Sequence, residues 1–147
     1  MATRVVSHVD VPLPPDEVWA RFLRLNDWPR WFPALTAVDC NRPQLAVGAQ
    51  LTLHLQMAGR GAKVTCTVQQ LDDQRVRWVG RAFGVTGDHS FFVERRGDGA
   101  RFTSDETFSG FPLLLVPKRY LEPLQLEADA GLLRFAALCQ PPAPEDG

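Results

Sequence analysis

The chain has 147 residues, which is enough for one domain that buries about two thirds of its unfolded surface in a single core. Sixteen Lys and Arg residues face seventeen Asp and Glu residues, so the formal net charge is −1. No run of like charge occurs, which argues against nucleic acid as a partner and against a polybasic membrane patch. The apolar stretch at 113–116 is far too short for an integral membrane segment. We expect a small or neutral partner.

The cysteines and histidines provide no sign of a disulfide framework or a metal site. Cys40, Cys66 and Cys139 are odd in number and widely spaced, with no CxxC pair, which is typical of free thiols in a reducing cytoplasm. The three histidines stand alone, without a neighbour at metal-ligand spacing. The N-terminus lacks the apolar core of a signal peptide. We therefore expect a cytoplasmic protein that needs no metal and no cofactor.

The first predicted elements are a strand and two helices. Residues 4–11 alternate with period two, which is typical of a half-buried strand, and one face carries Val5, Ser7, Val9 and Val11. Prolines and acids at 14–17 suit the first turn of a helix over 15–25. Four of its residues are expected on the inner side: Val18, Trp19, Phe22 and Leu23. The aromatic, proline-broken segment 27–33 predicts a short packed helix.

Six further strands are predicted after this point: 34–40, 51–57, 62–71, 76–83, 89–95 and 100–110. The turns between them are too short for parallel crossovers, so the strands form one antiparallel sheet. Pairing across the turn at Asp73 and Gln74 sets Trp78 opposite Gln69 rather than Val68. One of these two strands is therefore expected to carry a β-bulge, and whether Trp78 faces inward stays open.

The last segment is predicted to be the long helix that covers this sheet. Apolar residues recur at steps of three and four: Leu121, Leu124, Ala128, Leu132, Phe135 and Cys139. The interleaved polar residues are expected to point to water: Glu122, Gln125, Glu127, Asp129, Arg134 and Gln140. Pro117 and Pro123 disfavour a regular interior, so the continuous helix should begin near 121–123.

Together these elements predict an α+β domain over 1–140, in which a curved antiparallel sheet of about seven strands wraps around the C-terminal helix. Residues 141–147 contain three of the chain's prolines and are expected to form a disordered tail. A curved sheet around one helix does not close perfectly, and the gap would suit a small molecule, although most protein cores are filled.

Several segments along nearly the whole chain resemble the START-like helix-grip superfamily, and within it the polyketide cyclase/dehydrase and lipid-transport family (SRPBCC). They are Val9–Trp19, Trp28–Pro33, Trp78–Gly80, His89–Phe91 and Glu106–Gly110. The resemblance implies a hydrophobic ligand in a cavity between the curved sheet and the C-terminal helix, and some members of the family catalyse cyclisation or dehydration there. Pro117 and Pro123 depart from many relatives, which bears on the shape of the cavity mouth.

Glu106 is the most unusual ionisable residue of the predicted inner face. It alternates with Phe102, Ser104 and Phe108, so period two directs it toward the core. A loop centred on Asp98 and Gly99 would set Phe91 opposite Glu106 and His89 diagonal to it.

An inward His89 and Glu106 are then candidates for a catalytic base and acid. Two alternatives stay open. Glu106 is a structural anchor tied to a backbone group or an arginine, or a one-residue slip turns Asp105 and Thr107 inward instead.

The residues expected to line a ligand site are Leu53, Leu55, Cys66, Trp78, His89, Phe91, Glu106, Phe108, Tyr120, Leu124 and Ala128. The leading hypothesis is the binding of a small hydrophobic ligand, lipid-like or aromatic polyketide-like. One alternative is a cyclase or dehydratase that uses Glu106 and His89. Another is a protein-interaction module without a ligand, which would show an exposed apolar patch near 113–116. Whether the chain is an enzyme, and whether it forms a homodimer, stays open.

Overall fold

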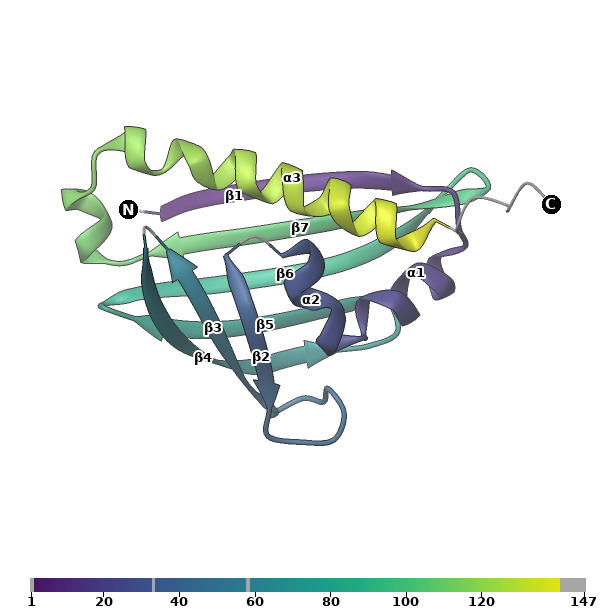
Figure 1. Ribbon diagram of the computed structural model, residues 1–147, viewed down its shortest axis with the longest axis horizontal. Coiled ribbons are helices and arrows are strands. Elements are labelled where there is room, and N and C mark those ends of the chain that lie inside the picture. The colour runs from purple at the N-terminus through teal and green to yellow at the C-terminus, as the bar shows by residue number, and fades with distance from the viewer. Residues whose placement is uncertain (1, 33, 58, 141–147) are drawn as a thin grey trace.

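The computed structural model describes residues 2–32, 34–57 and 59–140. The predicted tail, 141–147, lies outside the described residues. Seven strands form one antiparallel sheet in the order β1-β7-β6-β5-β4-β3-β2. Their bounds are β1 Ala2–Val11, β2 Leu35–Cys40, β3 Gln50–Met57, β4 Arg60–Leu71, β5 Arg75–Ala82, β6 Val85–Arg96 and β7 Gly99–Ser109. The sheet bends around the C-terminal helix, which confirms the α+β prediction (Figure 1).

The C-terminal helix, α3, spans Glu122–Cys139 and follows two short 3-10 turns, η2 Phe111–Leu115 and η3 Lys118–Tyr120. Pro117 precedes η3, and Pro123 lies in the first turn of α3, where a missing N–H breaks no helical hydrogen bond. The expected irregular start and the helix beginning near 121–123 are therefore confirmed.

α3 packs along the edge strand β1 rather than across the middle of the sheet (Figure 1). The face predicted from its period is confirmed, because Leu132, Phe135 and Cys139 are buried and the earlier members of the stripe are half-buried. Gln125 and Asp129 are exposed, as predicted, but both also form hydrogen bonds that the period does not indicate. They bind β1, because the helix lies directly over that strand.

The contacts of these two polar residues fasten α3 to β1. Gln125 Nε2 donates a hydrogen bond to the carbonyl of Val6 at 2.8 Å. Asp129 Oδ1 accepts hydrogen bonds from Ser7 Oγ at 2.6 Å and from Gln125 Nε2 at 3.0 Å. A helix held at one edge leaves the inner faces of the more distant strands to be covered by other elements.

Two short helices cover part of that remaining face: α1 Pro15–Phe22 and α2 Trp28–Trp31, joined by the 3-10 turn η1 Leu25–Asp27. The predicted short helix in 27–33 is confirmed. The first helix ends three residues before the predicted position, because the chain leaves it at Leu23. Leu23 is consequently exposed, and its prediction as an inner residue is wrong.

The aromatic side chains of these two helices pack with those of β6, β7 and α3 in a buried cluster, here called the aromatic core. Its members are Trp19, Phe22, Trp28, Trp31, Phe91, Phe102 and Phe135, all buried. The Phe22 ring lies 5.0 to 5.3 Å from the rings of Trp28, Phe91 and Phe102. Trp28 Nε1 donates a hydrogen bond to the Phe22 carbonyl at 2.7 Å, so the indole is buried with its polar atom paired.

Two turns differ from the sequence predictions and shift the strands that follow them. β5 reverses at Phe83 and Gly84, not between Gly84 and Gly87, and Phe83 has a positive φ of 54° and is exposed. Gly87 instead lies within β6, opposite Gly80. The β6–β7 turn contains only Gly97 and Asp98, because Arg96 pairs with Gly99.

The shorter β6–β7 turn corrects the predicted register. His89 lies directly opposite Glu106, and Phe91 lies opposite Ser104. The predicted bulge between β4 and β5 is confirmed, since the register shifts between Val68 and Gln70 and restores the pairing of Val68 with Trp78.

Candidate functional site

A row of five paired residues crosses the inner face of the sheet and contains both candidate catalytic residues. Across the neighbouring strands, the row reads Val5, Glu106, His89, Trp78 and Val68. Directly paired side chains on one face of an antiparallel sheet are close enough to interact. The register alone therefore brings the carboxylate and the imidazole together.

Both nitrogens of the His89 ring are engaged. Nδ1 lies 3.1 Å from Glu106 Oε2, and Nε2 lies 2.7 Å from Ser104 Oγ. Ser104 was not among the predicted site residues, although its period-two spacing from Glu106 put both on one face. These two contacts, with the Ser104 hydroxyl and the Glu106 carboxylate, fix the orientation of the imidazole ring.

The burial of this chain of groups increases from Glu106 to Ser104. The Glu106 side chain is 27% exposed, whereas that of His89 is 6% exposed and Ser104 is buried. In the Ser-His-Asp triad of a hydrolase, the serine hydroxyl contacts the substrate and the carboxylate is buried. Here the order of burial is the opposite, because the serine is buried and the carboxylate is partly exposed. The arrangement therefore presents a positioned carboxylate to its surroundings, with the histidine and serine behind it.

Cys66 lies close to this carboxylate and is a neutral thiol. Burial and, to a smaller extent, the negative charge of Glu106 raise the pKa of Cys66 to about 11. A protonated thiol is a poor nucleophile. We therefore treat Cys66 as an apolar side chain of the site. Its sulfur also fills the space beside Gly80, where a Cβ atom would approach Sγ to 2.6 Å.

The other predicted ligand-lining residues fall into three groups. Leu53, Trp78 and Phe91 are buried, and Trp78 faces inward with its ring 5.4 Å from that of Trp28. A second group is half-buried: Leu55, Phe108, Leu124 and Ala128. Tyr120 does not join them, because it lies on η3 with its ring exposed and beneath the Arg119 guanidinium. Whether these residues bind a ligand stays a prediction.

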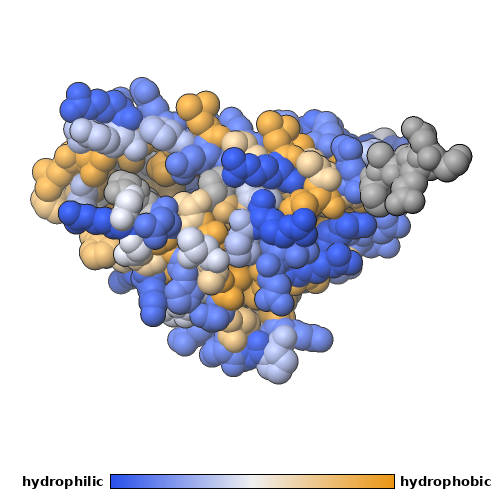
Figure 2. All heavy atoms as spheres, viewed as in Figure 1, coloured by the Kyte–Doolittle hydropathy of each residue, from blue (hydrophilic) through white to orange (hydrophobic). Residues whose placement is uncertain are grey.

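The half-buried apolar residues gather at the end of the sheet where α3 begins, here called the open end. It is formed by Leu55, Val64, Phe108, Leu124 and Ala128. The space-filling view shows hydrophobic atoms set back between the start of α3 and the tip of the β3–β4 hairpin (Figure 2). α1 and α2 contact the opposite half of the inner face, so the sheet is incompletely covered here. Glu106 lies on β7 two residues before Phe108, on the same face of the strand.

Two pockets are formed by described residues. One lies among α1, α2 and the last turn of α3, and the other lies beside the end of β1 and the start of β7. Neither contains the predicted ligand residues. Within 2–32, 34–57 and 59–140, no group of three His, Cys, Asp or Glu side chains is arranged to hold a metal ion, and no helix is long and apolar enough to cross a membrane.

The bent antiparallel sheet, the long C-terminal helix against it and the two short helices after the first strand define a helix-grip protein. The chain belongs to the family described as "Polyketide cyclase / dehydrase and lipid transport", which matches residues 2–140. This confirms the resemblance drawn from the sequence segments. No curated protein matches the chain in sequence.

Solved structures with low sequence identity share this fold. The Zhui aromatase/cyclase from Streptomyces sp. R1128 has a TM-score of 0.78 at 15% identity, over 100% of this chain and 99% of that chain. TTHA0849 from Thermus thermophilus has a TM-score of 0.77 at 13% identity, over 93% and 97%. The di-domain ARO/CYC StfQ from the steffimycin biosynthetic pathway has a TM-score of 0.73 at 12% identity, and the match covers 92% of this chain but 49% of StfQ.

Proposed function

We propose that this protein binds a small hydrophobic ligand, lipid-like or aromatic polyketide-like, at the open end, with Glu106 contacting a polar group of the ligand. The observation that carries the proposal is the partly exposed Glu106 carboxylate, fixed by His89 and bordered by half-buried apolar side chains. A site of this kind buries the apolar body of a ligand and uses few polar groups to orient it. The family description, which includes lipid transport, supports the same class of ligand.

The geometry of Glu106 favours a ligand with a hydrogen-bond donor. An ionised carboxylate accepts hydrogen bonds only, and one of its oxygens already faces His89 Nδ1. The remaining acceptor positions suit a ligand hydroxyl, such as that of a sterol, a flavonoid or a phenolic polyketide. Fatty acids would bring a second carboxylate beside the first, so they should bind more weakly than neutral hydroxylated ligands.

Native mass spectrometry of the purified protein tests whether a hydrophobic molecule is retained. Thermal-shift measurements with fatty acids, sterols, flavonoids and aromatic polyketides then compare ligand classes. A ligand at 100 times its dissociation constant stabilises the native state by about 2.7 kcal/mol. Absence of a retained molecule, together with no shift for any apolar class, would contradict the proposal.

A cyclase or dehydratase is a second candidate, favoured by the 3.1 Å contact between Glu106 and His89. Glu106 would contact the substrate and accept its proton. His89 would orient the carboxylate, because its own ring is buried and both nitrogens are occupied. Turnover of an aromatic polyketide precursor that disappears in Glu106→Gln, while the precursor still binds, would establish this activity. Binding without turnover would leave the carrier function.

An interaction module is a third candidate, favoured by the exposed apolar side chains of η2. Phe111 and Leu115 are 71% and 74% exposed, whereas Leu113 within the same turn is buried. Figure 2 shows hydrophobic atoms at the end of the molecule where η2 lies. Light scattering over a concentration series would detect a homodimer, and Leu115→Ser should abolish it if this surface forms the contact.

We also infer a cytoplasmic location, which the free thiols support.

A further inference from the structure

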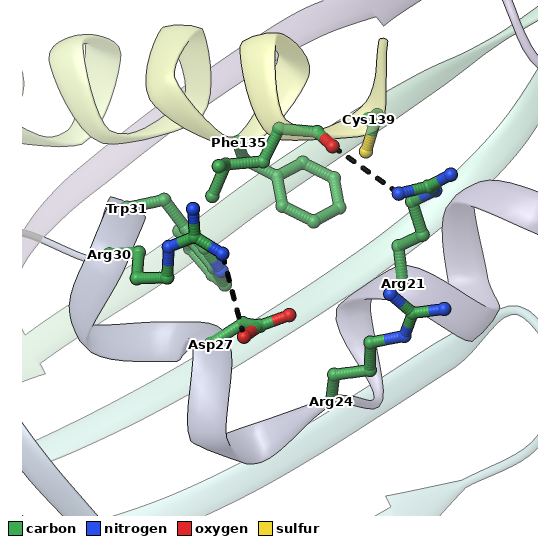
Figure 3. A pocket seen from close by; sticks show the side chains of 8 residues that line it. Arg21, Arg24, Asp27, Arg30, Trp31, Phe135 and Cys139 are labelled. Atoms are coloured by element: carbon green, nitrogen blue, oxygen red, sulfur yellow. Dashed lines mark hydrogen bonds and ion pairs between the residues drawn. The ribbon is translucent and has the colours of Figure 1, made fainter. Parts of the chain in front are cut away.

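A small pocket lies where α1, α2 and the last turn of α3 meet, at the opposite end of α3 from the open end (Figure 3). Its volume is about 80 Å³. The lining residues are Arg21, Arg24, Asp27, Arg30, Trp31, Phe135, Leu138 and Cys139. A single water needs roughly 10–15 Å³, so the pocket can hold a polyatomic group.

The lining is strongly positive. Arg21, Arg24 and Arg30 are opposed by Asp27, the one carboxylate among the described residues that line the pocket. Asp27 Oδ1 lies 3.9 Å from Arg30 Nη1, which is a loose ion pair. Figure 3 shows Arg21 and Arg24 on one side of the pocket and Arg30 on the other. Two positive charges are therefore left without a carboxylate of the pocket to neutralise them.

The end of α3 offsets only part of this charge. Arg21 Nη1 donates a long hydrogen bond of 3.4 Å to the carbonyl of Leu138, in the last turn of the helix, where the helix dipole is negative. One carbonyl uses one of the five N–H groups of a guanidinium, so most donors of Arg21 stay available to a ligand. Arg24 and Arg30 are exposed at the rim.

The floor of the pocket is apolar and cannot supply the missing negative charge. Trp31, Phe135 and Cys139 are buried. Burial raises the pKa of the Cys139 thiol to about 11, even though Arg21 and Arg24 act to lower it, so the sulfur is neutral.

We propose that this pocket binds the phosphate group of a small phosphate monoester, held by Arg21, Arg24 and Arg30. A phosphate monoester carries about −1.5 to −2 charges at pH 7 and three acceptor oxygens, which matches two unopposed positive charges presented from two sides. A guanidinium group can donate two parallel hydrogen bonds to two oxygens of one phosphate. A ligand carboxylate has only two oxygens, so it could bind fewer of the three arginines at once. The ester carbon would rest on the apolar floor.

The site is separate from Glu106, but two of its lining residues, Trp31 and Phe135, belong to the aromatic core. The Trp31 ring borders the pocket and lies 5.1 Å from Phe135 and 5.9 Å from Phe91. Binding at the arginines should therefore change the environment of Trp31. The intrinsic fluorescence of the chain, to which Trp31 contributes as one of four tryptophans, offers a readout of occupancy at this pocket.

Isothermal titration calorimetry with inorganic phosphate and with phenyl phosphate, at constant ionic strength in chloride, tests the proposal. We expect saturable binding of both, tighter for phenyl phosphate because of the apolar floor. Arg24→Gln and Arg30→Gln should each weaken binding about tenfold, since each removes a charge-assisted hydrogen bond. Asp27→Asn should tighten binding, because it removes the opposing negative charge.

Arg95→Gln is the matched control, since Arg95 is an exposed arginine on β6 outside this pocket. Its affinity for phosphate should equal that of the wild type. The proposal is overturned if the wild type shows no saturable binding, or if Arg95→Gln weakens binding as much as Arg24→Gln does. An unchanged affinity in Asp27→Asn would also contradict the placement of the anion beside that carboxylate.

Discussion

The two halves of the inner face of the sheet differ in how completely they are covered. Around the aromatic core, α1 and α2 add large rings to those of the sheet, and Phe91 and Phe102 are almost fully buried. At the open end, where α3 begins beside β1, Phe108 and Leu124 are only half-buried. One half of the interior is therefore tightly packed, and the other half, where we propose that a ligand binds, is only partly buried.

Replacing a phenylalanine in each half gives the largest expected difference. Phe102 and Phe108 are on the same face of β7, six residues apart, so they form a matched pair. Phe102→Ala should cost about 3–5 kcal/mol of unfolding free energy, because it leaves a cavity in a packed core. Phe108→Ala should cost about half as much or less, since its ring is already partly in contact with solvent. Urea unfolding of both variants measures the difference, and equal losses would mean that the open end is packed as tightly as the core.

His89 lies at the boundary between the two halves, and its removal should have the next largest effect. His89→Ala leaves Ser104 Oγ without its imidazole partner and opens a cavity beside Phe91, whose ring lies 4.2 Å away. We expect a loss of about 2–4 kcal/mol. His54 is the control, because it also contacts a carboxylate, Asp39, at 2.7 Å but is more exposed. His54→Ala should cost much less, and a similar loss in both would contradict the structural role of His89.

The sequence predicts the strands and helices of the two halves, but not how neighbouring strands are aligned with each other. Period two identified the inner face of β7, and the prolines at 117 and 123 located the start of α3. The register between β6 and β7 depended on the length of one turn, and Gly97, Asp98 and Gly99 suit turns of two or three residues equally well. His89 was therefore assigned a diagonal rather than a direct position.

Other features depend on contacts that a linear pattern does not contain. The periodicity of α3 gives its buried face but not the strand beneath it, so the binding of Asp129 to Ser7 on β1 was missed. Arg21, Arg24 and Arg30 come from separate short helices and turns, and only the folding of α1 and α2 against the end of α3 brings them around one pocket. The sequence predicts Tyr120 in the ligand site, whereas the residue lies exposed on the 3-10 turn η3, which the sequence does not specify.

Glu106→Gln should separate stability from ligand binding. The amide keeps the size of the side chain and its place beside His89 Nδ1, so we expect a stability change below about 1 kcal/mol. Affinity for ligands with a hydroxyl group should change by about tenfold, because a charged acceptor becomes a neutral one. Thermal shifts with the ligands found by native mass spectrometry measure both effects. Strong destabilisation at pH 7 would identify Glu106 as a structural anchor instead.

Asp105 is the control for Glu106 and should give the smallest effect. It is the adjacent residue on β7, but it faces the outer side of the sheet and pairs with Arg4, whose Nε and Nη2 donate to its two carboxylate oxygens at 3.0 and 2.8 Å. The hydrogen bond from Arg4 lowers the pKa of Asp105 in the folded protein. Asp105→Asn should leave ligand preference unchanged, and the exposed ion pair should contribute little to stability.

The pH dependence of that small contribution has a defined sign. Because the pKa of Asp105 is lower in the folded than in the unfolded state, its stabilising contribution is present at neutral pH and is lost as the pH falls through the folded pKa. The difference in unfolding free energy between the wild type and Asp105→Asn should therefore shrink between neutral and strongly acidic pH. Urea unfolding at a series of pH values measures it, with the exposed turn residue Asp98→Asn as the reference. A difference that stays constant down to acidic pH would show that the loss comes from side-chain packing rather than from the charge of Asp105.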